Sequence, residues 1–178
     1  MKRQTTVAAL LFLLTMSLSA QQQDKSKRPS PPGTAAISFA DGRKVTIEYS
    51  RPSAKGREIY GGLVPYDQVW RTGANEATSL KTDSDLVIGG TTVPAGSYTL
   101  FSLPSKGSWK LILNKQVGQW GTNYDQSQDL ARVDMSTSPL PQAVEQFTIS
   151  LDKTGGDSAK LNLDWEKTRA SVDLKEKK

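Results

Sequence analysis

Apolar and polar residues alternate with a period of two along much of the chain. In the stretch RKVTIEYS, Val45, Ile47 and Tyr49 share one face, because successive side chains of a β-strand point to opposite faces. Trp109 and Trp165 fall in similar stretches, where we expect them in the core. The predicted strands are residues 36–40, 43–50, 77–82, 85–88, 91–93, 97–103, 108–114, 143–151, 159–166 and 169–174.

Short turns separate most of these strands. Asp41-Gly42 and Gly89-Gly90 are two-residue hairpin signals. Connections this short join antiparallel neighbours, since a parallel crossover needs about a dozen residues or more. The sequence therefore predicts an all-β fold, an antiparallel β-sandwich of jelly-roll-like or Greek-key type with few or no helices. The best candidate for a short helix is residues 125–131.

Two long stretches have no strand pattern. Residues 51–69 are rich in Gly and Pro, and residues 115–125 read KQVGQWGTNYD. Long loops in a compact domain are usually functional or disordered. The aromatic and aliphatic residues of both loops indicate that they pack against the domain.

The N-terminus has the order of a secretory signal peptide: a basic pair, an apolar run over residues 7–14, and small residues up to Ala20. The run is far shorter than the roughly 20 apolar residues of a spanning helix. We therefore expect an exported protein, periplasmic or extracellular, that is soluble after cleavage. The predicted divisions are a signal peptide (1–20), a flexible polar and Pro-rich leader (21–34), a single β-sandwich domain (35–174) and a frayed tail (175–178).

Composition narrows the chemistry. The chain has no Cys and no His, which removes the Cys of a lipid anchor, disulfides, thiol and Ser-His-Asp nucleophiles, and His-ligated metals. We expect no metal, no cofactor and no recognised catalytic motif; the chain is more readily a non-enzyme, although the question stays open. The formal net charge of +5 comes without a basic stripe interleaved with aromatics, so we expect no nucleic-acid partner. We also expect no stable membrane insertion after signal cleavage.

One segment groups side chains that suit binding. Within VWRTGANEAT, an aromatic ring, a guanidinium, an amide and a carboxylate lie around Gly73, a set that fits a carboxylate, phosphate or sugar. Two arginines of the preceding loop and one loop tryptophan join this site if the loops fold over it. The candidate ligand-binding residues are Trp70, Arg71, Asn75, Glu76, Arg51, Arg57 and Trp120.

A structural interpretation of the same residues stays open. In it, Trp70 plugs one end of the sandwich, which is the favoured interpretation for that residue alone. Arg71 then pairs with Glu76 or Glu48. Asn75 adopts a left-handed turn conformation or caps one.

Several longer motifs resemble one family. They are YSRPSAKGREIYGGLVPYDQVWRTGANEATSL, PAGSYTLFSLP, SWKLILNK, QWG with a following Tyr, EQFTISL and LNLDWEKT. Over roughly residues 33–174 the chain resembles DUF2911, a family of exported or lipid-anchored bacterial envelope proteins. The resemblance implies an all-β sandwich and an envelope location, and it implies no activity, substrate or catalytic residue. The chain departs from the lipid-anchored members because it lacks the Cys.

Three functions remain open. The first is a non-enzymatic envelope module that binds a polar or anionic ligand, which is a glycan, peptide or small molecule. The second is a carboxylate-dependent hydrolase or lyase, for which Glu76 is the one nominated acid and a second acid about 5–10 Å away is required. The third is an envelope assembly or interaction protein that pairs through a sheet edge or an exposed apolar patch.

Overall fold

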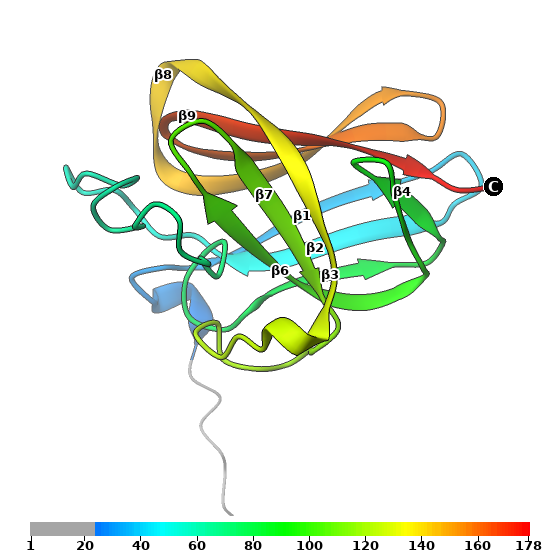
Figure 1. Ribbon diagram of the computed structural model, residues 1–178, viewed down its shortest axis with the longest axis horizontal. Coiled ribbons are helices and arrows are strands. Elements are labelled where there is room, and N and C mark those ends of the chain that lie inside the picture. The colour runs from blue at the N-terminus through cyan, green and yellow to red at the C-terminus, as the bar shows by residue number, and fades with distance from the viewer. Residues whose placement is uncertain (1–23) are drawn as a thin grey trace, which may run out of the picture.

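The structure, a computed structural model, describes residues 24–178 as an all-β protein with two short 3-10 turns (Figure 1). All pairings between named strands are antiparallel, so the predicted fold class is confirmed. The predicted signal peptide, residues 1–20, lies outside the described residues. The strands are β1 (Pro32–Ser38), β2 (Lys44–Ser50), β3 (Thr78–Thr82), β4 (Leu86–Ile88), β5 (Thr91–Val93), β6 (Gly96–Pro104), β7 (Trp109–Asn114), β8 (Asp129–Gly155) and β9 (Ser158–Glu176), and the turns are η1 (Lys25–Lys27) and η2 (Gln126–Gln128).

One strand, β8, connects two layers. Its first part, from Asp129 to Met135, pairs with β7, and its continuation from Ser136 pairs with β9. The strand order is therefore continuous, β1-β2-β3-β6-β7-β8-β9-β4-β5. In Figure 1, β8 and β9 lie above β1 and β2 as a second layer. The β4–β5 hairpin also belongs to this second layer, because β4 pairs with β9. The next strand, β6, lies in the first layer again, where it pairs with β3.

The segment that follows β2 joins the two layers at another point. Phe147 of β8 donates its backbone N–H to the carbonyl oxygen of Pro52 at 2.9 Å. Residues 51–69 therefore begin as a hydrogen-bonded partner of β8. Ile59 and Val64, farther along this loop, are both buried, as its apolar residues predicted.

Aromatic rings fill the space between the layers. Trp165 of β9 is 1% exposed and stacks on Trp70 with ring centroids 5.7 Å apart. Trp109 of β7 is also buried, so both tryptophans expected in the core lie there. Tyr49 of β2 packs edge-on against Phe147 of β8 at 5.8 Å. Aromatic pairs in such geometries stabilise a core beyond the area that they bury.

The N-terminal segment differs from the predicted flexible leader. From residue 24 onwards it contains η1, and β1 starts at Pro32 rather than after residue 34. Pro32 pairs with Ser50 of β2. Arg28 forms an ion pair with Glu76. These long-range partners hold the segment in place, and its polar composition does not reveal them.

The tail and the later strands also differ from the prediction. Lys175 and Glu176 pair with β4, so the end of the chain is part of the sheet. Residues 125–131 hold only η2 before β8 begins at Asp129, because the chain there pairs with β7. The last three predicted strands are parts of β8 and β9. In β8, a register shift between Pro139 and Val144 lets the pairing with β9 continue past Pro139 and Pro141.

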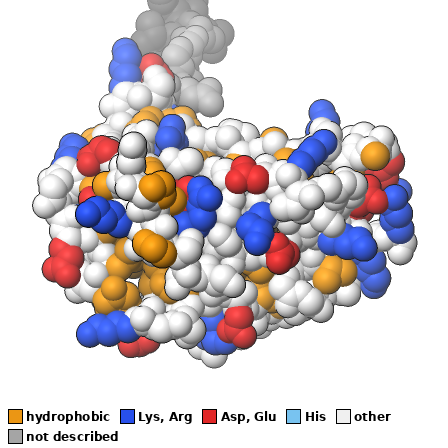
Figure 2. Space-filling model, turned by 90° about the horizontal axis from the view of Figure 1, so that it is seen from above, with side chains coloured by type: hydrophobic (Ala, Val, Ile, Leu, Met, Phe, Trp, Pro, Cys, Tyr) orange, Lys and Arg blue, Asp and Glu red, His pale blue; other side chains and the backbone are white. Residues whose placement is uncertain are grey.

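Figure 2 shows basic and acidic side chains intermixed over one face of the molecule, with hydrophobic side chains between them. Neither sign of charge forms a continuous field on this face. Within residues 24–178, no helix has the length and apolar composition needed to cross a membrane.

The Tyr49 hydroxyl bridges the layers, because it accepts the backbone N–H of Ile149 at 2.9 Å inside the core. We expect Tyr49→Phe to lower the free energy of unfolding by about 1–3 kcal/mol, since that N–H is then buried without a partner. Urea unfolding followed by tryptophan fluorescence measures the loss. Tyr66→Phe is the control, because the half-buried Tyr66 makes no side-chain hydrogen bond with the other described residues. Equal losses in both variants would contradict this role of Tyr49.

Candidate functional site

Residues 71–77 form a loop that leaves the edge of β6 and then returns to it. Trp70 exchanges two backbone hydrogen bonds with Ser102 of β6, at 2.8 and 2.9 Å. Two residues along β6, Leu100 pairs with Thr78 of β3. The chain therefore lies beside β6 both before and after residues 71–77, which loop out between these two pairings. We call this loop the excursion. This is the segment whose composition indicated a binding site.

The excursion contains backbone that most residues avoid. Thr72 has a φ of 53° and is fully buried, a costly combination for a β-branched residue. Its hydroxyl donates to Ser102 Oγ at 3.0 Å, and its carbonyl accepts from Thr78 Oγ1 at 2.8 Å. Gly73 follows with a φ of 151°, and a Cβ there would lie 2.9 Å from the Ser50 carbonyl oxygen. Backbone strain held in place by its surroundings clusters at functional sites.

The second long loop fastens the excursion. Gly121 donates its N–H to the Asn75 carbonyl at 3.0 Å, and Ala77 donates to the Gln119 carbonyl at 3.1 Å. A Cβ at Gly121 would lie 2.7 Å from Cδ of Arg71. Because Gly121 has no side chain, the Arg71 stem lies directly against the loop backbone.

A cavity of about 430 Å³ opens beside the excursion, and we call it the Arg71 cavity. Volumes of about 300–1,000 Å³ are typical of small-molecule sites. Its walls are mainly aromatic and aliphatic, and two guanidiniums are the charged groups among its lining side chains. No carboxylate or carboxamide side chain is among the described residues that line it. The lining residues are Ser30, Pro52, Arg57, Leu63, Val64, Val69, Trp70, Arg71, Gly73, Ala74, Phe101, Gly121, Thr122, Tyr124 and Trp165.

Arg71 is an exception among the arginines of residues 24–178. Arg71 is a half-buried residue, and its guanidinium makes no hydrogen bond or ion pair with any described residue. Removing a charged group from water without a partner costs free energy, which a bound anion would offset. The partners of the other arginines are Glu76 for Arg28, Asp41 for Arg43, Thr148 for Arg51, the Ser53 and Ala54 carbonyls for Arg57, Asp129 for Arg132, and Asp164 for Arg169.

Glu76 and Asn75 hold the N-terminal segment instead of lining the Arg71 cavity. The Glu76 carboxylate accepts from Arg28 at 2.9 Å and pairs with Lys25 at 3.1 Å. The Arg28 hydrogen bond is the main cause that lowers the pKa of Glu76 to about 2. Asn75 has a left-handed φ of 58°, and its side-chain amide donates to the Ser30 carbonyl at 3.1 Å.

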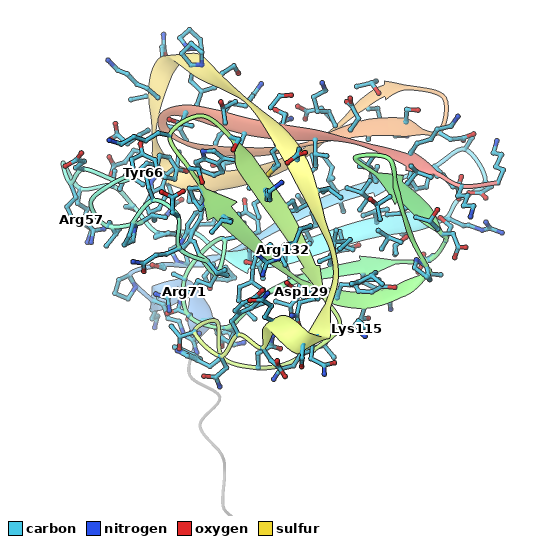
Figure 3. All side chains as sticks on the ribbon, in the orientation of Figure 1. Arg57, Tyr66, Arg71, Lys115, Asp129 and Arg132 are labelled. Carbon is cyan, nitrogen blue, oxygen red and sulfur yellow. The ribbon has the colours of Figure 1, made fainter. Side chains whose placement is uncertain are left out.

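Of the remaining candidate residues, Arg57 lines the Arg71 cavity, whereas Arg51 and Trp120 do not. Arg57 lines the cavity with Trp70 and Arg71, although its Nε also donates to the Ala54 carbonyl at 2.9 Å. Figure 3 shows Arg57 on the loop after β2 and Arg71 between that loop and the start of β8. Arg51 bonds to β8 and Trp120 is 49% exposed; neither lines the Arg71 cavity.

Tyr124 is a cavity residue that the candidate set omitted. Its ring packs edge-on against Phe101, with centroids 4.8 Å apart. Its hydroxyl donates to Asp129 at 2.7 Å and accepts from Arg132 at 2.6 Å. Burial, followed by the Asp129 hydrogen bond, raises the pKa of Tyr124 to about 12. The aromatic after QWG was the sequence signal, whereas its two partners lie at the start of β8 (Figure 3), where no strand was predicted.

The ion pair of Glu76 has a pH dependence with a definite sign. Because the pKa of the folded state lies near 2 and the ordinary value is 4.5, the stabilisation is complete above about pH 4.5 and disappears as the pH falls through about 2. We expect Glu76→Gln to remove no more than about 1 kcal/mol at pH 7, since the side chain is 40% exposed. Urea unfolding at pH 7, 4 and 2 should show the difference from wild type shrinking toward acid.

Glu48→Gln is the matched control, because Glu48 lines the same cavity as Glu76 but forms no ion pair within the described part of the chain. We expect its stability to follow that of wild type at each pH. A difference between Glu76→Gln and wild type that stays constant from pH 7 to pH 2 would contradict the ion-pair assignment.

Comparison with known proteins gives one match. The family model of DUF2911, described as a protein of unknown function, matches residues 30–174. This range contains β1 to β8, almost all of β9 and every residue that lines the Arg71 cavity. No curated protein and no solved structure matches the chain. The protein belongs to the DUF2911 family, as the motifs in its sequence predicted.

Proposed function

We propose that this protein is an exported, non-enzymatic module that binds an anionic ligand in the Arg71 cavity. The observation that carries this proposal is the half-buried Arg71 guanidinium, which has no partner among the described residues. Arginine presents a rigid fork of donors that matches carboxylate and phosphate oxygens. A ligand anion at this fork would supply the partner that the protein itself does not.

The charge balance of the cavity supports the same function. Arg57 adds a second positive group to the lining, and no side chain among the described lining residues is acidic. Because Arg71 and several lining residues are partly or fully buried, an ion pair formed there is screened less than one on the open surface. The cavity therefore favours an anion over a neutral molecule of the same shape.

The hydrolase alternative has weaker support. Glu48 and Glu76 line one cavity of about 280 Å³, so two acids do share a cavity. A carboxyl group that acts as a general acid needs a raised pKa, whereas Arg28 and Lys25 lower the pKa of Glu76 to about 2. This pairing supports a structural role for Glu76, in holding the N-terminal segment.

The binding site is tested by removing the Arg71 charge while keeping its aliphatic stem. The anionic probes are glucuronate, phenyl phosphate and 2-naphthoate, and we expect at least one of them to raise the melting temperature of the wild type more than its uncharged counterpart does. A ligand at about 100 times its Kd stabilises by about 2.7 kcal/mol. In Arg71→Met this shift should vanish, and calorimetric titration should show affinity reduced about tenfold or more.

Lys81→Met is the charge-matched control, because Lys81 is an exposed residue of β3 that does not line the cavity. It should retain the anion-induced shift. If no anion stabilises the protein, or if Arg71→Met responds as the wild type does, the proposed site is wrong.

Export has its own test, and its support is the order of charged, apolar and small residues over positions 1–20. We expect the full chain, expressed in a bacterium with a general export pathway, to accumulate outside the cytoplasm. N-terminal sequencing should find a mature chain that starts at Gln21 or within a residue or two of it. An uncleaved chain retained in the cytoplasm would contradict export.

A further inference from the structure

Resting on the proposed function, we infer that the ligand is an organic acid with a flat apolar body, an aromatic carboxylate, rather than a sugar acid or other polyhydroxylated anion. The cavity offers one unpaired guanidinium for the acid group and aromatic walls for the remainder of the molecule. Three features of the lining argue for this class.

The first feature is a shortage of hydrogen-bond acceptors. Each hydroxyl of a sugar has a proton to donate, and guanidinium groups accept no hydrogen bond. Among the described lining residues, no carboxylate or carboxamide side chain is present. Ser30 and Thr122 contribute hydroxyls, but the Ser30 carbonyl already accepts from Asn75. Among the described lining residues, a polyhydroxylated ligand would therefore find no carboxylate or carboxamide acceptor and would depend on two hydroxyls and on backbone carbonyls.

The second feature is the state of the Tyr124 hydroxyl. Its one proton is donated to Asp129, and it also accepts from Arg132. The hydroxyl therefore has no proton for a ligand, and the part of Tyr124 that contributes to recognition is its ring. Asp129 and Arg132 act as positioning residues, since they fix the hydroxyl and with it the orientation of the ring against Phe101.

The third feature is the aromatic content of the walls. Trp70 and Tyr124 are the partly exposed rings of the lining, and Trp165 and Phe101, each 1% exposed, pack against them. Trp165 covers one face of Trp70, with an interplanar angle of 18°, so the two rings form a rigid pair. Flat rings gain from offset-stacked or edge-to-face contact with such walls. With the acid group at Arg71, a flat ligand body would lie against Trp70 and Tyr124.

The test is calorimetric titration of the mature protein, residues 21–178, with a matched probe set. The probes are 2-naphthoate, its uncharged amide 2-naphthamide, the saturated decalin-2-carboxylate, and glucuronate. We expect 2-naphthoate to bind about tenfold or more tightly than either 2-naphthamide or glucuronate. The decalin acid should bind between these limits, because it keeps the charge and apolar area but not the flat shape.

A second variant places a negative charge in the lining without removing a cavity wall. Ala74 is a half-buried lining residue, and we expect Ala74→Asp to weaken 2-naphthoate binding about tenfold or more by charge repulsion. Ala77→Asp is the matched control, since Ala77 is in the same excursion but lines the neighbouring cavity at Glu76. It should bind 2-naphthoate as the wild type does. Circular dichroism and the melting temperature confirm that each variant is folded.

The outcomes separate the inference from the proposal beneath it. If glucuronate binds as tightly as 2-naphthoate and both depend on Arg71, the ligand class is wrong while the anion site stands. If 2-naphthoate and 2-naphthamide bind equally in wild type and in Arg71→Met, the anion site itself is wrong and the inference falls with it. Equal weakening by Ala74→Asp and Ala77→Asp would also overturn the placement of the ligand in the Arg71 cavity.

Discussion

The contact on which both the fold and the site depend is the stack of Trp70 on Trp165. Trp70 is held to β6 by its backbone pairing with Ser102, and its ring lies on a residue of β9 in the other layer. The same ring packs edge-on against Phe147 at 5.0 Å. One side chain therefore joins the two layers and forms a wall of the cavity. Because the ring and backbone of Trp70 are fixed, the following residue, Arg71, starts from a fixed position as well.

Two local costs come together at the site. Thr72 is buried in left-handed backbone, and Arg71 is half-buried with no partner among the described residues. The other described arginines all have partners, as in the bidentate contact between Arg169 and Asp164. Natural proteins tend to concentrate such departures at functional positions, where the surrounding structure compensates for them. Here the compensation comes from the aromatic core and from the loop that contains Gly121.

Much of the fold was predictable because side-chain alternation reports which face of a strand is buried. The period of two located β2, β3, β4, β5, β6 and β7 to within two residues. It missed the first half of β8, where most side chains are exposed and Pro139 interrupts the pattern. A strand that buries few apolar residues leaves little trace in the sequence, although its backbone pairs with β7 from Asp129 to Met135.

The site was predictable as a segment but not as a geometry. Trp70, Arg71, Asn75 and Glu76 are close in sequence, yet the left-handed backbone at Thr72 and Asn75 sends their side chains to different neighbourhoods. Period and composition do not encode such reversals. Likewise, the pairing of Arg28 with Glu76 spans 48 positions, and no local pattern indicates it.

That long-range pair also occupies a carboxylate that the sequence suggested as a partner of Arg71. Glu76 is five positions from Arg71 and was one of the two partners expected for it. The structure gives this carboxylate to Arg28 and Lys25 instead. If Glu76 paired with Arg71, the guanidinium would be neutralised and an incoming anion would have to displace an internal one. By holding Glu76, the N-terminal segment leaves Arg71 uncompensated. The segment that composition indicated as a flexible leader therefore occupies a carboxylate that was an expected partner of Arg71, although neither Lys25 nor Arg28 lines the cavity.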